Sequence, residues 1–237
     1  MNEARTIPPC DWAARVRAWL ELKLALAVGL NLWVYLPYQW LQHHQYFPER
    51  TMPTGWIDRG IPFWPQAVWI YLSVYLLMPL GPFLMRNQRQ LLRYAAGIVF
   101  ISLLADIFFL FWPTTCPRPV AADANLAYRL LVRVDNPFHA FPSLHAAFAV
   151  YSALCAGLVR REICAPARWE VGLWAWTFLI LFATMATKQH VFVDIVAGGG
   201  LAVVAFVCVF KQSATNCRHQ QIVPVGGNLN RSNSNQS

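Results

Sequence analysis

The chain alternates long apolar stretches with short polar segments, and this pattern predicts transmembrane helices. A helix needs about 20 mostly apolar residues to cross the hydrocarbon core of a bilayer. Six stretches approach that length, and they cover residues 22–41, 62–84, 91–112, 142–159, 169–186 and 191–210. We therefore predict an all-α, polytopic membrane protein in which six transmembrane helices form one bundle.

The segments outside these stretches complete the predicted domain organisation. Residues 1–21 include an amphipathic, arginine-bearing segment that we expect on the cytoplasmic side of the membrane. Residues 22–210 form the predicted membrane domain. Residues 211–237 are polar and poor in bulky apolar groups, a composition typical of a disordered cytoplasmic tail.

Composition supports a protein whose partner is the lipid bilayer. Hydrophobic residues make up 57% of the chain and charged residues only 13%, whereas about a quarter of the residues in a soluble domain are charged. The aromatic content of 14% suits rings that lie at the two membrane interfaces. The sequence does not indicate an oligomeric state.

The distribution of charge predicts membrane orientation and argues against nucleic-acid binding. The net charge is +8, but the basic residues are scattered through loops and form no patch interleaved with aromatics. Most lysines and arginines fall on the side of the two termini when six spans alternate across the membrane. By the positive-inside rule, both termini are cytoplasmic, and we expect the protein in the plasma (inner) membrane.

Ionisable side chains at membrane depth are the first candidates for chemistry, because they are costly there and usually face a cavity or a partner. His190 and Asp194 are four residues apart and therefore share one face of a helix. The aspartate can hold one imidazole nitrogen and leave the other as a base or nucleophile. Alone, the pair is also compatible with a structural hydrogen bond. Asp106, within the third stretch, has no assigned role.

The stretch "FHAFPSLHAAFAV" provides a second group of candidates. Pro142 suits the first turn of a helix, and Ser143 places a hydroxyl beside amides that have no partner within the helix. A helix start of this kind attracts an anion, and His145 lies in that first turn. Alone, His145 could equally be an interfacial histidine.

Two cations belong with these candidates. Arg118 lies between prolines in "WPTTCPRPV" and can contact two phosphate oxygens at once. Lys188 precedes His190 in "TKQHVFVD". With alternating spans, Arg118, His145, Lys188 and His190 all fall on the extracytoplasmic face. We therefore predict one active site there.

Together these residues resemble the motifs of the type 2 phosphatidic acid phosphatase (PAP2) superfamily of integral membrane enzymes. The second motif of that family, Pro-Ser-Gly-His, is similar to the Pro-Ser-Leu-His of residues 142–145. The third motif ends in His-x-x-x-Asp, as at His190 and Asp194, and the first ends in Arg-Pro, as at Arg118 and Pro119. The resemblance is greatest to the branch that includes inositol phosphorylceramide synthases and related bacterial lipid phosphatases.

The resemblance implies phosphoryl transfer from a lipid phosphate through a phosphohistidine, with no metal and no cofactor. His190 would attack phosphorus, Asp194 would orient it, and His145 would protonate the leaving oxygen. The phosphate would be bound by Arg118, Lys188 and the helix start at Ser143. Two positions depart from the family pattern, because Phe111 replaces the lysine of the first motif and Thr184 the arginine of the third.

Three other interpretations stay open at this point. Instead of hydrolysing its substrate, the protein could transfer a phospho-headgroup to a lipid acceptor. It could be a metal enzyme in which two histidines and an aspartate are ligands, although its six cysteines show no C-x-x-C spacing. It could also be a non-catalytic transporter or scaffold, in which the polar side chains form ordinary interhelical hydrogen bonds.

Overall fold

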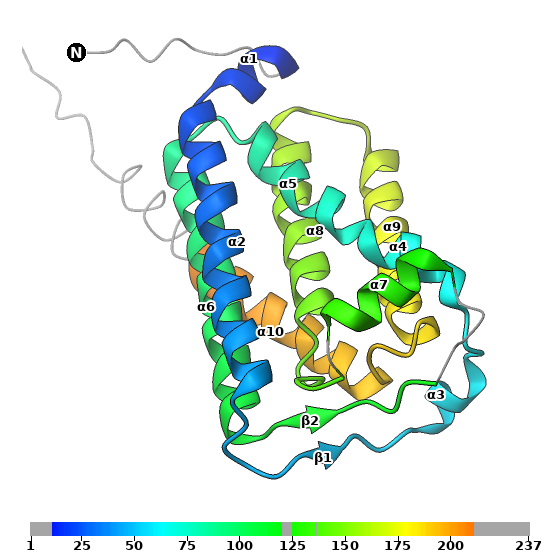
Figure 1. The fold of residues 1–237 in the computed structure, drawn as a ribbon. Coiled ribbons are helices and arrows are strands. Elements are labelled where there is room, and N and C mark those ends of the chain that lie inside the picture. The colour runs from blue at the N-terminus through cyan, green and yellow to red at the C-terminus, as the bar shows by residue number, and fades with distance from the viewer. Residues whose placement is uncertain (1–10, 120–124, 136, 211–237) are drawn as a thin grey trace, which may run out of the picture.

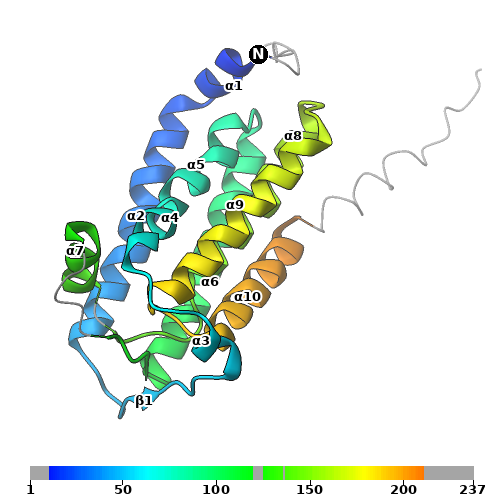
Figure 2. The ribbon, with the colours of Figure 1, turned by 90° about the vertical axis from the view of Figure 1, so that its right-hand side faces the viewer.

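The computed structural model describes residues 11–119, 125–135 and 137–210 of the chain. These residues form a bundle of long helices, with shorter elements at its two ends (Figures 1 and 2). The first ten residues of the predicted N-terminal segment and the predicted disordered tail, residues 211–237, lie outside the described residues. The division of the chain into three segments stays a prediction.

Each predicted apolar stretch corresponds to helical structure whose ends differ from the prediction by only a few residues. The bundle consists of α2 (Leu20–His43), α5 (Val74–Leu84), α6 (Gln88–Phe111), α8 (Leu144–Glu162), α9 (Ala167–Ala186) and α10 (Phe192–Phe210). Among the described residues, five segments are long and apolar enough to cross a membrane: Leu20–His43, Pro65–Leu84, Gln88–Phe111, Ala167–Ala186 and Phe192–Phe210. The predicted all-α membrane fold is confirmed.

The remaining predicted span is α8, and its sequence reflects a position inside the bundle. Most of its 19 residues are buried, and it packs against α5, α6, α9 and α10. Small residues such as Ala149, Ala153 and Gly157 allow these neighbours to approach closely. The helix carries His145 in its first turn and Arg160 in its last turn, which lowers its overall apolarity. The count of six transmembrane helices therefore stays a prediction.

The second predicted stretch is interrupted within its length. It comprises a 3-10 helix (Pro65–Ala67), α4 (Val68–Leu72) and α5, with a break between the two α-helices at Ser73. The Ser73 hydroxyl donates to the Ile70 carbonyl oxygen at 2.6 Å and accepts from the indole N–H of Trp176 at 2.8 Å. These bonds satisfy polar groups at the break. Tyr71 on α4 and Tyr75 on α5 consequently flank the same histidine, as described below.

The shorter elements are α1 (Trp12–Arg17), β1 (Arg50–Thr51), α3 (Trp56–Gly60), β2 (Thr114–Thr115) and α7 (Leu126–Val134). Strands β1 and β2 form a two-stranded parallel pair at the end of the bundle opposite α1 (Figure 1). Thr115 also forms a bridge with Phe138. The segment that leads to Arg118 is thereby tied to the loop that precedes α8.

Close packing of α10 against the start of α8 depends on a glycine. A Cβ atom at Gly198 would lie 2.3 Å from the Ser143 carbonyl oxygen and 3.2 Å from the Ala147 amide nitrogen. We expect Gly198→Ala to force these helices apart and to destabilise the protein by about 1–3 kcal/mol. The measurement is thermal unfolding in detergent, followed by near-UV circular dichroism.

Gly200→Ala is the matched control for this prediction. Nothing lies within 4 Å of a Cβ atom built at Gly200, and alanine has the higher helix propensity. Its unfolding temperature should therefore equal or slightly exceed that of the wild type. Equal unfolding temperatures for the Gly198 and Gly200 variants would contradict the packing argument.

Candidate active site

His190 lies in the turn between α9 and α10, and its ring orientation is set by two acceptors. Its Nδ1 atom is 2.8 Å from the Ala140 carbonyl oxygen and 3.5 Å from the Oδ2 atom of Asp194. A carbonyl oxygen can only accept a hydrogen bond, so Nδ1 carries the proton and donates it. The Nε2 atom is therefore left with its lone pair, as a nucleophile requires.

Asp194, in the first turn of α10, is completely buried and links three segments of the site. Its Oδ2 atom accepts from the Val191 N–H at 3.1 Å, in the turn that carries His190. Its backbone carbonyl accepts from the Ser143 N–H at 3.1 Å, which joins the start of α10 to the start of α8. The carboxylate therefore fixes the turn and also lies beside the imidazole that it was predicted to orient.

His145 lies in the first turn of α8, where Ser143 is the N-cap. The Ser143 hydroxyl is buried and accepts from the Ala146 N–H at 3.3 Å. The imidazole stacks on the ring of Tyr71, with centroids 4.1 Å apart, and its Nδ1 atom is 3.0 Å from the Tyr71 hydroxyl. Its Nε2 atom is buried and has no hydrogen-bond partner among the described residues. This nitrogen is available to a ligand.

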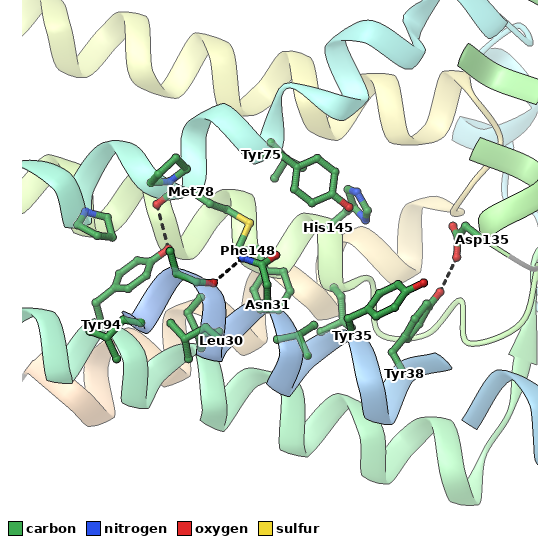
Figure 3. Close-up of a pocket in the computed structure, with 18 of the residues that line it drawn as sticks. Leu30, Asn31, Tyr35, Tyr38, Tyr75, Met78, Tyr94, Asp135, His145 and Phe148 are labelled. Atoms are coloured by element: carbon green, nitrogen blue, oxygen red, sulfur yellow. Dashed lines mark hydrogen bonds between the residues drawn. The ribbon is translucent and has the colours of Figure 1, made fainter. Parts of the chain in front are cut away.

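The two predicted catalytic histidines line one cavity of about 460 Å³, which we call the inner cavity. Asp135 and His139 also line it, and Tyr75 contacts His145 edge-on with ring centroids 6.0 Å apart (Figure 3). Away from these residues the inner cavity extends between α2 and α5 and is mostly apolar.

His190 also lines a second cavity of about 450 Å³, the outer cavity, which has a cationic lining. Arg59, Arg118 and Lys188 contribute to its walls. Burial raises the pKa of Cys116, another lining residue, to about 12. Its thiol is therefore protonated at neutral pH and does not compete with His190 as a nucleophile.

Lys188 is held in position by backbone groups. Its ammonium donates to the carbonyl oxygens of Asp58 at 3.0 Å and Ile61 at 2.6 Å, at the end of α3. Its backbone is left-handed, with a φ of 55°. The two bonds use two of the three donors of the ammonium, and the charge remains at the wall of the outer cavity.

Arg118 forms a partly buried ion pair that the sequence did not suggest. Its guanidinium donates to the backbone carbonyl of Asp135 and, at 3.3 Å, to the carboxylate of the same residue. That carboxylate also accepts from the Tyr38 hydroxyl at 2.6 Å and from the Gln42 amide at 3.3 Å. Helix α2 therefore helps to position the arginine predicted to bind phosphate.

Several side chains at the site were missed by sequence reasoning. Asp135 and His139 lie just upstream of the Pro-Ser-Leu-His segment, and His139 is inside the stretch singled out there. His139 is 3% exposed and packs on Phe109, with ring centroids 5.0 Å apart, so burial lowers its pKa and keeps it neutral. Nothing in the sequence indicated a role for Tyr71, because a tyrosine within an apolar stretch is common.

The structure separates some predicted residues from the two cavities. The Ser143 hydroxyl is engaged in capping α8, and Asp106 is half-buried on α6 outside both linings. Phe111 is 62% exposed at the end of α6. Thr184 is buried and donates to the Ile180 carbonyl at 2.7 Å. The two positions that depart from the family pattern therefore do not line the site.

No group of three or more His, Cys, Asp or Glu side chains in the described part of the chain is arranged to bind a metal ion. The described polar residues instead line the two cavities beside His190 with basic and hydrogen-bonding groups. Such a lining is suited to an anion.

Comparison with known proteins yields a family match for the chain. Neither a curated protein nor a solved structure matches the chain. The family model described as the PAP2 superfamily matches residues 52–208, a range that includes Arg118, His145, His190 and Asp194. The branch of inositol phosphorylceramide synthases is not distinguished by this match and stays a prediction. Because the match covers well over half of the sequence, the chain belongs to the PAP2 superfamily, which indicates phosphoryl-transfer activity on lipid phosphates.

Proposed function

We propose that the protein hydrolyses a lipid phosphate or diphosphate through a phosphohistidine on His190, without a metal ion. One observation carries the proposal. The His190 ring lies where two cavities meet, one shared with His145 and the other with Arg118 and Lys188, and its Nδ1 atom is engaged by Ala140. The nucleophile therefore has the proton donor in one adjoining cavity and the cations in the other.

In the first step, the Nε2 lone pair of His190 attacks phosphorus. As the N–P bond forms, the bond from phosphorus to the lipid oxygen breaks, and that oxygen takes a proton from Nε2 of His145. The Tyr71 hydroxyl lies 3.0 Å from Nδ1 of His145 and can either donate or accept there. This hydroxyl can therefore hydrogen-bond to the His145 ring in both of its protonation states. Asp194 stabilises the positive charge that develops on His190.

Charge neutralisation at the phosphoryl oxygens provides most of the remaining catalysis. Arg118 and Lys188 supply the positive charges from the outer cavity. Leu144 and His145, in the first turn of α8 after its Ser143 cap, line the inner cavity, and a helix start of this kind attracts an anion. In this arrangement Ser143 acts by capping the helix that binds the anion.

In the second step, a water molecule attacks the phosphohistidine and gives its proton to His145. The N–P bond breaks, inorganic phosphate leaves, and His190 regains its lone pair. A lipid hydroxyl in place of water would make the protein a phosphotransferase, by the same exchange of bonds. We place this chemistry on the extracytoplasmic face of the plasma membrane, with both termini cytoplasmic, because of the charge distribution of the loops.

The test is an assay of the purified, full-length protein in detergent. Phosphatidic acid and a prenyl diphosphate are supplied with EDTA, and phosphate release is measured. A parallel assay follows a labelled phospho-headgroup into a lipid acceptor. We expect phosphate release that EDTA does not change. Headgroup transfer without phosphate release would establish the transferase instead. Loss of activity with EDTA, or no reaction in either assay, would overturn the proposal.

A further inference from the structure

The inner cavity is longer than a phosphate site requires. One end is lined by His145 and His190, and the lining continues along α2 as far as Lys23. From Tyr38 to Lys23, two lining residues on α2, the helix rises by roughly 22 Å. This is most of the thickness of a hydrocarbon core, which is about 30 Å. Figure 3 shows Tyr75 and Asp135 near His145, and Met78 and Tyr94 farther along the cavity.

The lining changes in character along its length. Polar groups lie near the histidines, whereas the middle is formed mostly by apolar side chains from four helices: Leu26, Leu30, Val34, Met78, Ile98 and Phe148. Asn31 also lines the middle, and its amide donates to the Ala27 carbonyl oxygen of its own helix at 2.7 Å. The far end is closed by Lys23, which is 3% exposed. Its ammonium donates to the carbonyls of Arg15 at 2.6 Å and Phe83 at 2.8 Å, so its hydrogen bonds are directed to backbone.

The cavity also opens sideways, toward the space that lipid would occupy. Helix α2 packs chiefly on α6, and α5 forms the other side of the opening. Ala27, Tyr35 and Tyr75 line the cavity and are nevertheless exposed. A chain could therefore enter from the bilayer. Helix α2 also lies outside the family match, which begins at residue 52.

We propose that the inner cavity binds one hydrocarbon chain of the lipid phosphate and that α2 determines which chains fit. The inference rests on the proposed function, because the phosphate of that lipid is the group placed beside His190. Bilayer hydrocarbon is as apolar as the cavity, so transfer of the chain adds little affinity. The cavity acts by shape instead. It admits a chain whose extended length does not exceed the space between α2 and α5, and only an admitted chain lets its phosphate reach His190.

Filling the cavity at Ala27 tests the proposal. Ala27 lies roughly 16 Å along α2 from Tyr38, so a tryptophan there obstructs a long chain and spares a short one. We expect Ala27→Trp to lower the ratio of kcat/KM for hexadecyl phosphate to that for hexyl phosphate at least tenfold. Ala25→Trp is the matched control, since Ala25 is an exposed alanine of α2 outside the lining. Its ratio should equal that of the wild type.

A second pair of variants tests the wall of the cavity that α5 forms. Met78 on α5 lines the cavity, whereas Leu76 is 67% exposed and does not. Met78→Trp should lower the same ratio, and Leu76→Trp should leave it unchanged. Farnesyl and geranyl phosphates, tested in parallel, distinguish an isoprenyl chain from a linear one as the preferred occupant. An unchanged ratio in both Ala27→Trp and Met78→Trp would overturn the proposal.

Photolabelling examines the cavity without relying on hydrolysis. Hexadecyl phosphate with a diazirine at the chain terminus is added to the full-length protein in detergent. The mixture is irradiated, and the labelled peptides are mapped. We expect label on α2 near Ala27 and on α5 near Met78. Labels confined to outward-facing positions such as Val28 would contradict the proposal. Correct labelling without phosphate release would support the chain site while counting against the proposed hydrolysis.

Discussion

His190→Asn is expected to lower the rate of phosphate release from a lipid phosphate by a factor of about 10⁴ or more. Asparagine can still donate to the Ala140 carbonyl, which lies 2.8 Å from Nδ1 of the native ring. It has no lone pair on nitrogen that could attack phosphorus, so the covalent step is lost while the turn can keep its shape. The measurement is the initial rate of phosphate release by the purified variant, compared with the wild type.

His44→Asn is the control. His44 directly follows α2, is exposed, and stacks on Trp40 with ring centroids 4.8 Å apart, outside both cavities. The rate of phosphate release by His44→Asn should equal that of the wild type. Brief reaction of the wild type with a ³²P-labelled lipid phosphate should also leave acid-labile label on the protein, which His190→Asn should lack. Retained turnover in His190→Asn, or label elsewhere, would exclude this residue as the nucleophile.

Much of the fold could be predicted because membrane solvation leaves a strong signal. A spanning helix must be apolar over about 20 residues, and the predicted stretches correspond to α2, α5, α6, α8, α9 and α10. Helix α8 does not fit this rule as well. Because α8 packs against other helices, its sequence can include alanines, a glycine and polar groups. Its apolar character is therefore a weaker sign of a spanning helix than that of the other segments.

The grouping of the other site residues with His190 could be predicted from the topology. Alternating spans predict that Arg118, His145 and Lys188 lie at the same end of the bundle, and in the structure each of them shares a cavity with His190. Their individual partners were not predictable. The bond of Asp135 to Tyr38 joins residues 97 positions apart in the chain, and no local pattern specifies such a pair.

The same limit applies to groups whose partners are backbone atoms. The Ala140 carbonyl orients His190, and the carbonyls of Asp58 and Ile61 hold Lys188. Every residue has a carbonyl group, so side-chain identity does not reveal which ones converge on a site. Sequence motifs therefore indicate which groups react, whereas the contacts that orient them become visible only in the structure.

His145→Asn should lower the rate of phosphate release from an alkyl phosphate by about 10² to 10⁴-fold, the usual contribution of a general acid. An alkoxide is a poor leaving group, so its departure depends on the proton that His145 supplies. A nitrophenolate needs no such proton. With para-nitrophenyl phosphate the variant should therefore lose much less activity, and the comparison of the two substrates is the measurement.

This dependence on the leaving group separates proton donation from structural support. His145 packs on Tyr71, so its removal could also disturb the start of α8. A disturbed helix would lower the rates with both substrates to a similar extent. The control is Tyr71→Phe, which keeps the stacked ring and removes the hydroxyl 3.0 Å from Nδ1. It should show a smaller loss with the same preference for the nitrophenyl substrate, because that hydroxyl assists His145 and does not itself protonate the leaving oxygen. Equal losses with both substrates in His145→Asn would show that this imidazole is not the acid.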